Sequence, residues 1–398
     1  MNQNLHENYQ VLVCGAGPAG LITAWKLAQS GISVALLDRR DPWREPVLCA
    51  EAISKSGLLN IVPQIDDHWI RGPVNGVFFV SPNGTRVQYL QEDAGYILNR
   101  AAMHKGLAQR AQKAGAHCHF RANVKKIEAV GDRWQAEVTF LDKQSFKITA
   151  DAIVDCTGAG GTLTRNIPEL VKLEQGRGDL ESGVFTLLEG IEHEKDHIQL
   201  FFGQKYFPGG YGWVFPRDDG SANVGIVLGK EQAKGNPARN LLRQWIENTW
   251  PHAKIGQFFG GAISCGQSTD RLALNGVFKA GDSASHVNPI SRSGIAEAML
   301  AGRITAENLV LWLEADAEEK RRIEDSLWGQ WMEAQGKTHL NIARAKPSFA
   351  SIPDKILDKA AEKIVKIPVE KRSLPRIFFT TLLRSPSLLW KMRSLMGL

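Results

Sequence analysis

Val11-Leu-Val-Cys-Gly15-Ala-Gly17-Pro-Ala-Gly20, close to the N-terminus, is the stretch that decides the fold of this chain. An apolar run ends at three glycines, and a second apolar run ends at Asp38. Gly15 permits a tight turn, Gly17 lets backbone amides approach a pyrophosphate, and Gly20 lets the following helix pack closely. Asp38 is placed to accept hydrogen bonds from a ribose hydroxyl. The pattern predicts a βαβ unit that binds a dinucleotide.

Composition restricts the classes of protein to which the chain can belong. Hydrophobic residues make up 43% and charged residues 23% of the 398, which is typical of a globular protein. The N-terminus lacks the layout of a signal peptide, and no apolar run reaches the roughly 18 residues of a membrane span. The five cysteines form no CxxC pair, so neither a metal site nor an iron–sulfur cluster is expected. We expect a protein of the reducing cytoplasm.

The C-terminal stretch carries the excess of positive charge. Residues 341–398 hold twelve Lys/Arg against four Asp/Glu. Stacking aromatics are sparse there, so nucleic acid is not the expected partner. Two apolar segments with basic residues, 377–383 and 388–398, fit either an interfacial helix at an anionic membrane surface or a helix packed on the body. The packed helix is the favoured interpretation.

The spacing of apolar residues and turns predicts a fold assembled from several pieces. Strands are expected over 9–14, 32–38, 152–156 and 276–282, and helices over 18–30, 97–114 and 294–313. Between 183 and 228, short apolar runs alternate with turns, as in an antiparallel sheet. The expected domains are a discontinuous dinucleotide-binding domain (1–70, 95–165, 270–315), a sheet domain (71–94, 166–269) and a basic, mainly helical region (316–398).

A second motif, residues 281–298, identifies the dinucleotide. Gly281-Asp282 follows an apolar run, and a predicted helix begins near Gly294. The Asp282 carboxylate can bond a ribityl hydroxyl, and the positive end of that helix would face the N1–C2=O edge of a flavin. Asp282 could instead be a simple N-cap, but together with Asp38 this segment indicates FAD rather than NAD.

Four motifs carry a resemblance to a known family. They are residues 15–20 (GAGPAG), 48–57 (LCAEAISKSG), 208–216 (PGGYGWVFP) and 281–289 (GDSASHVNP). The chain resembles the geranylgeranyl reductase family of the para-hydroxybenzoate hydroxylase-like flavoproteins, over roughly residues 9–315. The resemblance implies an α/β Rossmann-type FAD-binding domain with an inserted antiparallel-sheet substrate domain and a C-terminal helical segment.

The resemblance also implies a reaction, the reduction of C=C bonds in a polyprenyl chain. Hydride from reduced FAD would reach one alkene carbon and a proton the other, with Cys49 or Tyr211 as the proton source and Trp213 in the substrate wall. The electron donor would be NAD(P)H or ferredoxin. The residues implied in FAD binding are Gly15, Gly17, Pro18, Ala19, Gly20, Asp38, Arg39, Cys49, Ala50, Arg100, Val124, Gly158, Gly281, Asp282, Pro289, Ser293, Gly294 and Ile295.

Several of the residues singled out also have a plain structural interpretation. Tyr211, Trp213 and Phe215 alternate on a strand and therefore face one side, which is typical of a sheet core as well as of a substrate wall. A lone cysteine such as Cys49 is usually an inert apolar residue. Arg100 could form a surface ion pair instead of contacting FAD. Cys14 and Cys156 are expected to be structural.

Three departures from the family pattern leave other functions open. Thr157-Gly158 stands where hydroxylases of this fold carry Asp-Gly, Val227 replaces the last glycine of a Gly-x-Gly, and Ser291-Arg292-Ser293 replaces a glycine-rich loop. Arg292 could change the choice of substrate or the access of the electron donor. The alternatives are a flavin monooxygenase or halogenase with an aromatic substrate, an electron carrier to quinone, and a non-catalytic FAD-binding module.

Overall fold

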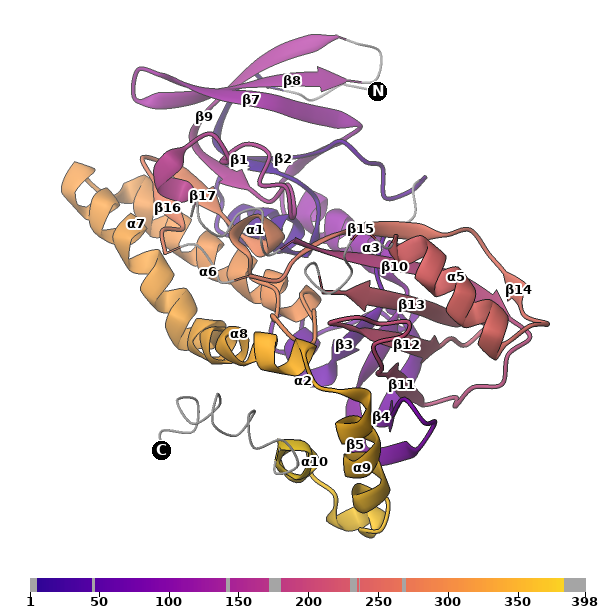
Figure 1. Cartoon of the computed structure of the whole chain (residues 1–398). Coiled ribbons are helices and arrows are strands. Elements are labelled where there is room, and N and C mark those ends of the chain that lie inside the picture. Colours follow the sequence, from indigo (N-terminus) through magenta and orange to yellow (C-terminus); the bar gives the residue numbers. More distant parts are fainter. Residues whose placement is uncertain are drawn as a thin grey trace.

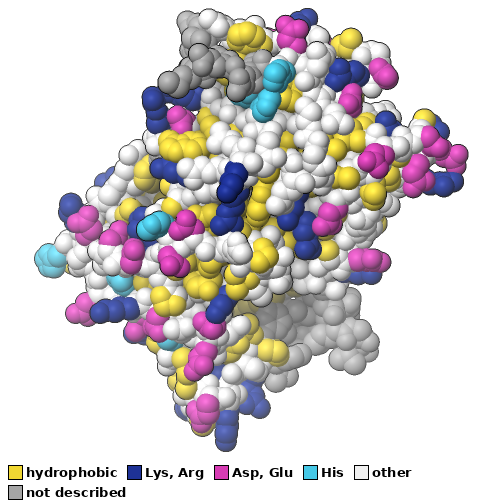
Figure 2. Space-filling view, turned by 180° about the vertical axis from the view of Figure 1, so that it is seen from behind, with side chains coloured by type: hydrophobic (Ala, Val, Ile, Leu, Met, Phe, Trp, Pro, Cys, Tyr) yellow, Lys and Arg dark blue, Asp and Glu magenta, His cyan; other side chains and the backbone are white. Residues whose placement is uncertain are grey.

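The computed structural model describes residues 6–44, 47–140, 144–171, 180–229, 235, 237–266 and 270–382. Figure 1 shows two β-sheets beside one another, with α1, α6 and α7 over the first and α5 over the second. Charged side chains of both signs are interspersed over the face seen from behind (Figure 2).

The first sheet gathers strands from distant parts of the chain. Its order is β16-β17-β9-β1-β2-β6, and the β7–β8 hairpin continues from β9. The central strands are parallel, with β1 between β2 and β9, and β17 on the far side of β9. This arrangement confirms the predicted βαβ unit. The strands are β1 (Asn8–Cys14), β2 (Val34–Asp38), β6 (His117–Phe120), β7 (Ala122–Val130), β8 (Arg133–Phe140), β9 (Ser145–Asp155), β16 (Ala273–Leu274) and β17 (Val277–Lys279).

Four helices share a hydrophobic core with this sheet: α1 (Pro18–Gln29), α3 (Arg100–Lys113), α6 (Ile295–Glu314) and α7 (Ala317–Trp331). Helices α1 and α6 can approach each other closely because Gly302 has no side chain. A Cβ atom on Gly302 would lie 2.4 Å from the carbonyl oxygen of Ala19. The Thr23 hydroxyl donates to the carbonyl of Gly302 at 3.1 Å. The N-terminal motif and the helix that follows the second motif are thereby packed together.

The second sheet is mainly antiparallel, as predicted. Its order is β14-β10-β13-β12-β11-β4-β5-β3, with β15 beside β10, and β11 runs parallel to β4. Helix α5 (Ala238–Thr249) packs on it through Leu242, Trp245 and Ile246. The strands are β3 (Ala52–Ser54), β4 (Ile70–Val80), β5 (Arg86–Leu98), β10 (Leu180–Glu189), β11 (His197–Phe201), β12 (Tyr211–Pro216), β13 (Ala222–Leu228), β14 (Lys254–Ile255) and β15 (Phe259–Ser264).

The helix predicted from residue 97 begins later. Ile97 and Leu98 are buried and pair with Ala52 and Ile70, so they end strand β5. The Asn99 side chain caps α3 by accepting a hydrogen bond from the N–H of Ala102 at 3.2 Å. The apolar spacing over 97–114 is typical of a helix, but its first two residues, Ile97 and Leu98, are the buried last residues of the strand.

The C-terminal helices extend along the body toward the second sheet (Figure 1). Ala360, Ala361 and Ile364 of α9 form a buried cluster with Val87 of β5, and Ile377, the first residue of segment 377–383, packs against this cluster. Residues 388–398, and the last residue of segment 377–383, lie outside the described residues. The helices are α8 (Lys337–Ala350), α9 (Asp354–Ile364) and α10 (Leu374–Leu382); the short α2 (Lys55–Leu59) follows β3.

Candidate active site

The glycine-rich loop between β1 and α1 is shaped by backbone contacts. A Cβ atom on Gly15 would lie 2.1 Å from the carbonyl oxygen of Cys156, and one on Gly20 would lie 1.8 Å from that of Gly15. A Cβ on Gly17 would meet nothing within 4 Å. Helix α1 begins at Pro18 with neither a side-chain cap nor an acid in its first turn. An open helix N-terminus behind two obligatory glycines fits the pyrophosphate of FAD.

Asp38 ends β2 beside this loop. Its carboxylate accepts hydrogen bonds from the N–H groups of Ala16, at 2.5 Å, and Arg40, at 2.6 Å. Burial raises the pKa of Asp38, although these two hydrogen bonds act in the opposite direction. The carboxylate lies next to the glycine-rich loop, a position that fits the ribose of FAD. Val124 is buried on β7, whereas Arg39 is exposed.

The second motif meets the first at the end of β17. A Cβ atom on Gly281 would lie 3.0 Å from the side chain of Ala19. The predicted strand 276–282 is too long, because pairing with β9 ends at Lys279 and Gly281–Ala284 form a 3-10 turn. Gly158, in the loop after β9, adopts a φ of 87°. Pro289 is buried after the 3-10 turn.

Asp282 and the start of α6 form the other end of the predicted FAD site. Helix α6 begins at Ile295 after Gly294, with no side-chain cap. A Cβ atom on Gly294 would lie 3.8 Å from Oδ1 of Asp282. Burial raises the pKa of Asp282 to about 6, against the attraction of Arg100. A carboxyl group beside an uncapped helix N-terminus fits a ribityl chain and the N1–C2=O edge of a flavin. The Ser293 hydroxyl donates to Glu297 at 2.6 Å.

The Cys49 thiol lies among hydrogen-bond donors. Nη1 of Arg100 is 3.0 Å from its Sγ, and the N–H of Glu51 is 3.2 Å away. Nη2 of Arg100 donates to Nε2 of His104 at 2.8 Å, and burial together with Arg100 lowers the pKa of His104 well below its usual value. Arg100 is only 6% exposed, so the alternative of a surface ion pair is wrong. The guanidinium group instead connects Cys49 with the surroundings of Asp282.

The aromatic strand faces the same region. The rings of Tyr211 and Trp213 are 6.3 Å apart, and those of Trp213 and Phe215 are 6.2 Å apart. All three belong to one hydrophobic cluster that includes Ala50, so the prediction of a common side is confirmed. A Cβ atom on Gly225 of β13 would lie 2.2 Å from the Trp213 ring, so this glycine leaves room for the indole. The aromatic wall of Tyr211, Trp213 and Phe215 is therefore in contact, through Ala50, with the loop that carries Cys49 (the Cys49 loop).

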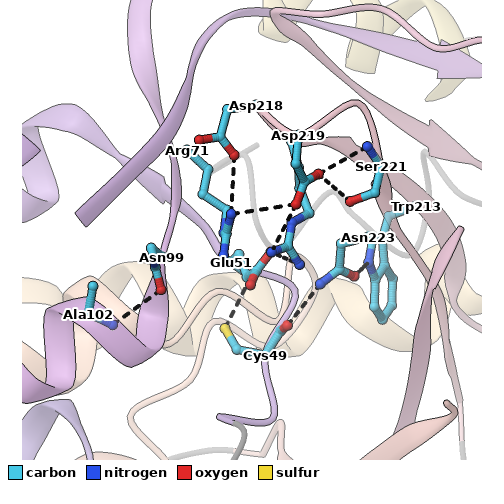
Figure 3. Close-up of polar contacts among 11 residues, drawn as sticks. Cys49, Glu51, Arg71, Asn99, Ala102, Trp213, Asp218, Asp219, Ser221 and Asn223 are labelled. Atoms are coloured by element: carbon cyan, nitrogen blue, oxygen red, sulfur yellow. Dashed lines mark hydrogen bonds and ion pairs between the residues drawn. The ribbon is translucent and has the colours of Figure 1, made fainter. Parts of the chain in front are cut away.

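Sequence reasoning missed Asn223, which is fully buried on β13. Its Oδ1 accepts a hydrogen bond from Nε1 of Trp213 at 2.9 Å, and its Nδ2 donates to the carbonyl of Cys49 at 3.1 Å (Figure 3). The available signal was an amide residue within the apolar run 222–228. A buried polar group requires partners, so its presence points to a local constraint.

An ion-pair network lies above Cys49, as Figure 3 shows. Glu51 has a φ of 79°, which is uncommon outside glycine, and its Oε2 is 3.7 Å from Nη1 of Arg217. Burial raises the pKa of Glu51, against Arg217, Arg71 and a hydrogen bond from Asn223. Arg217 and Arg71 both contact Asp219, each at 3.7 Å. The network ties the segment after Cys49 to the turn between β12 and β13.

Arg292 is directed away from solvent. It adopts a φ of 57°, and its guanidinium group forms an ion pair with Glu181 at 2.8 Å. Nζ of Lys346 contacts the same carboxylate at 2.8 Å. The Arg292 guanidinium lies 5.4 Å from the Tyr211 ring centre, and the Tyr211 hydroxyl donates to the carbonyl of Ser291. Burial raises the pKa of Tyr211 to about 12.

Within the described part of the chain, no group of three or more His, Cys, Asp or Glu is placed to hold a metal ion. No helix among the described residues is long and apolar enough to cross a membrane. Cys14, Cys156 and Cys265 are buried free thiols, while Cys49 and Cys118 are partly exposed.

Two family models match the chain. The geranylgeranyl reductase catalytic domain covers residues 179–263, and the pyridine nucleotide-disulphide oxidoreductase domain covers residues 9–179. A digeranylgeranylglycerophospholipid reductase from Methanosarcina acetivorans is 30% identical over 98% of this chain and 97% of its own. The enzyme of that name from Methanothrix thermoacetophila is 28% identical over 97% of this chain and 98% of its own. The similarity therefore extends well beyond residue 315, where the sequence motifs end.

Solved structures show the same fold. A geranylgeranyl bacteriochlorophyll reductase-like protein from Thermoplasma acidophilum has a TM-score of 0.86 at 24% identity, covering 98% of this chain and 99% of its own. A flavin-dependent brominase variant has a TM-score of 0.72 at 14% identity, covering 98% and 99%. Since reductases and halogenases share the architecture, these likenesses establish the fold alone.

Proposed function

Because the chain belongs to the geranylgeranyl reductase family of FAD-dependent oxidoreductases, we propose that it saturates C=C bonds in the geranylgeranyl chains of a lipid. The observation that carries the proposal is the buried wall of Trp213 and Phe215 in contact with the Cys49 loop. An isoprenoid chain needs an apolar surface, since burial of each CH₂ group contributes about 0.8 kcal/mol. The digeranylgeranyl phospholipid named for the relatives is our proposed substrate class.

Different residues around the site would hold different parts of FAD. The open N-terminus of α1 would hold the pyrophosphate, Asp38 the ribose, and Asp282 with the start of α6 the flavin end. Bound reduced FAD supplies hydride for one carbon of the alkene. The remaining requirement is a proton for the other carbon, together with the exclusion of water from the site.

We assign the proton to Cys49 rather than to Tyr211. The Tyr211 hydroxyl is engaged with the Ser291 carbonyl, and burial raises its pKa to about 12. Cys49 is partly exposed, and its sulfur accepts hydrogen bonds from the Arg100 side chain and from the backbone N–H of Glu51. Arg100 can stabilise the sulfur after the proton has left, because it is a permanent cation. This geometry favours the thiol as the acid.

The test is anaerobic. The photoreduced holoenzyme is mixed with geranylgeranyl diphosphate or a digeranylgeranyl phospholipid, and the product is analysed by mass spectrometry. We expect the oxidised flavin spectrum to return while the product gains two hydrogen atoms per double bond. Flavin that stays reduced until oxygen is admitted would overturn the proposal in favour of a monooxygenase or halogenase.

Two finer points belong to the same proposal. We propose NAD(P)H or ferredoxin as the reductant, which is tested by the rate at which each reduces the flavin. We also propose a cytoplasmic enzyme that meets an anionic membrane surface through the exposed side of α10, since Ile377 packs on the body whereas Leu374 is 46% exposed near the exposed, cationic Arg376. Flotation with anionic but not with neutral vesicles is the expected result, and equal recovery with both would contradict it.

A further inference from the structure

Asn223 is the buried polar group that joins the two sides of the proposed site. It lies on β13, where its exposed fraction is 0%. Trp213 comes from the neighbouring strand β12, whereas Cys49 comes from the stretch between β2 and β3. Three segments that are distant in the sequence therefore meet at one amide.

The chemistry of the partners fixes the orientation of this amide. The indole Nε1 of Trp213 can only donate, and the backbone carbonyl of Cys49 can only accept. The side chain must therefore present its oxygen to Trp213 and its nitrogen to Cys49, as observed at 2.9 Å and 3.1 Å. Aspartate could keep the first contact but not the second, and an apolar residue could make neither.

The Cys49 residue is held at both its backbone and its side chain. Asn223 holds the carbonyl, while Arg100 and the N–H of Glu51 hold the sulfur. Two anchors on one residue restrict its rotation as well as its position. A proton donor needs such restriction, because misplacement by about 1 Å can lower a rate on the order of a hundredfold.

We infer that Asn223 is a positioning residue, whose amide fixes the backbone of Cys49 relative to the indole of Trp213. The inference rests on the proposed function, because it takes Cys49 as the proton source and Trp213 as the substrate wall. Asn223 itself acts through these two residues and supplies no proton.

The experiment compares holoenzymes carrying Asn223→Ala, Asn223→Asp and Trp213→Phe with a matched control, Asn308→Ala. Asn308 is also a buried asparagine, 5% exposed, and it bonds Gln330 between α6 and α7. Alkylation of each cysteine by iodoacetamide is followed by peptide mass spectrometry. Cys118, on β6, reports general loosening of the fold within the same sample.

We expect Asn223→Ala and Asn223→Asp to raise the alkylation rate of Cys49 on the order of tenfold, because the loop opens more often. Trp213→Phe, which leaves the Asn223–Cys49 contact in place, should raise it much less. The Cys118 rate should not change in any variant, and Asn308→Ala should match the wild type at both cysteines. In prenyl-dependent turnover, Asn223→Asp should lower kcat, and KM should change by a smaller factor.

The opposite results overturn the inference. They are a Cys49 alkylation rate that stays at the wild-type value in both Asn223 variants, or a Cys118 rate that rises in proportion. If Asn223→Ala does not fold, Asn223→Asp and Trp213→Phe still give the comparison. Failure of the proposed function looks different: the wild-type flavin would not be reoxidised by any prenyl substrate, while the alkylation pattern would remain as expected.

Discussion

The two ends of the proposed FAD site differ, because one is formed by backbone atoms and the other by side chains. The pyrophosphate end is formed by backbone atoms, since Gly15 and Gly20 admit no side chain and α1 presents uncapped N–H groups. The flavin end is instead formed by buried side chains from α3 and from the second sheet, including Arg100, Asn223 and Glu181. The backbone at Gly15 and Gly20 tolerates no added atom, whereas a side-chain network can lose a member and keep its fold. Substitution of Gly15 or Gly20 should therefore abolish FAD binding, whereas substitutions at the flavin end should change stability, FAD affinity, rates or pH dependence.

The largest effect on FAD binding is expected in the glycine-rich loop between β1 and α1. Gly20→Ala places a carbon against the Gly15 carbonyl, and overpacking of this kind costs about 1–3 kcal/mol or more. We expect loss of FAD from the purified protein and a lower Tm. Gly17→Ala, where space is open, should keep the Tm of the apoprotein and weaken only FAD affinity. Flavin content and calorimetry distinguish the two, and equal Tm losses would contradict the comparison.

Removal of the Cys49 thiol should affect the rate and leave the cofactor in place. Cys49→Ser is expected to slow prenyl-dependent flavin reoxidation on the order of 10²- to 10⁴-fold, the usual range for general acid catalysis. FAD content should equal that of the wild type. Cys118→Ser serves as the control and should react normally. A Cys49→Ser enzyme with unchanged reoxidation would remove Cys49 from the mechanism.

The triad of Glu181, Arg292 and Lys346 should contribute to stability. Glu181→Gln leaves two cations without their shared anion, and breaking a buried ion pair costs about 3–5 kcal/mol. Urea unfolding measures this loss. Glu189, which pairs with Lys254 on the surface, provides the control, since Glu189→Gln should change stability by about 0.5 kcal/mol or less. Similar losses in both variants would show that burial of the triad does not matter.

The smallest effect concerns pH. The pKa of Asp282 is about 6 in the folded protein and 3.8 in the unfolded chain, so the folded state binds the extra proton between these values. The stability of the apoprotein should therefore fall as pH rises from about 4 to about 6, and then level off. Asp282→Asn should reduce this slope, stabilise the apoprotein at pH 7 by about 1–3 kcal/mol and weaken FAD binding. An unchanged slope would contradict the assignment.

The same contrast explains which features could be predicted from the sequence. The glycine loop and Asp38 belong to one βαβ unit, and Asp282 belongs to a short motif of its own, so the sequence pattern of each is local even where a contact, such as that of Gly15 with Cys156, is long-range. The common side of Tyr211, Trp213 and Phe215 followed from strand alternation alone. The FAD contacts, the catalytic roles and the domain boundaries remain predictions.

The partners at the flavin end could not be predicted, because each depends on a long-range contact. Asn223 meets Cys49 across 174 positions in the sequence, and Arg292 meets Glu181 across 111. No spacing rule relates such residues. The location of Arg100 beside Cys49 also required the fold, since a charged residue in the first turn of a helix is usually exposed.

The path of the chain near Cys49 has a mechanical consequence. Cys49 lies where the polypeptide passes from β2 in the first sheet to β3 in the second, and its carbonyl is bound by a residue of the second sheet. If the two sheets rotated apart to admit a long lipid, this crossing would be stretched and the thiol would leave its aligned position. The alignment of the thiol therefore depends on the two sheets keeping their relative position.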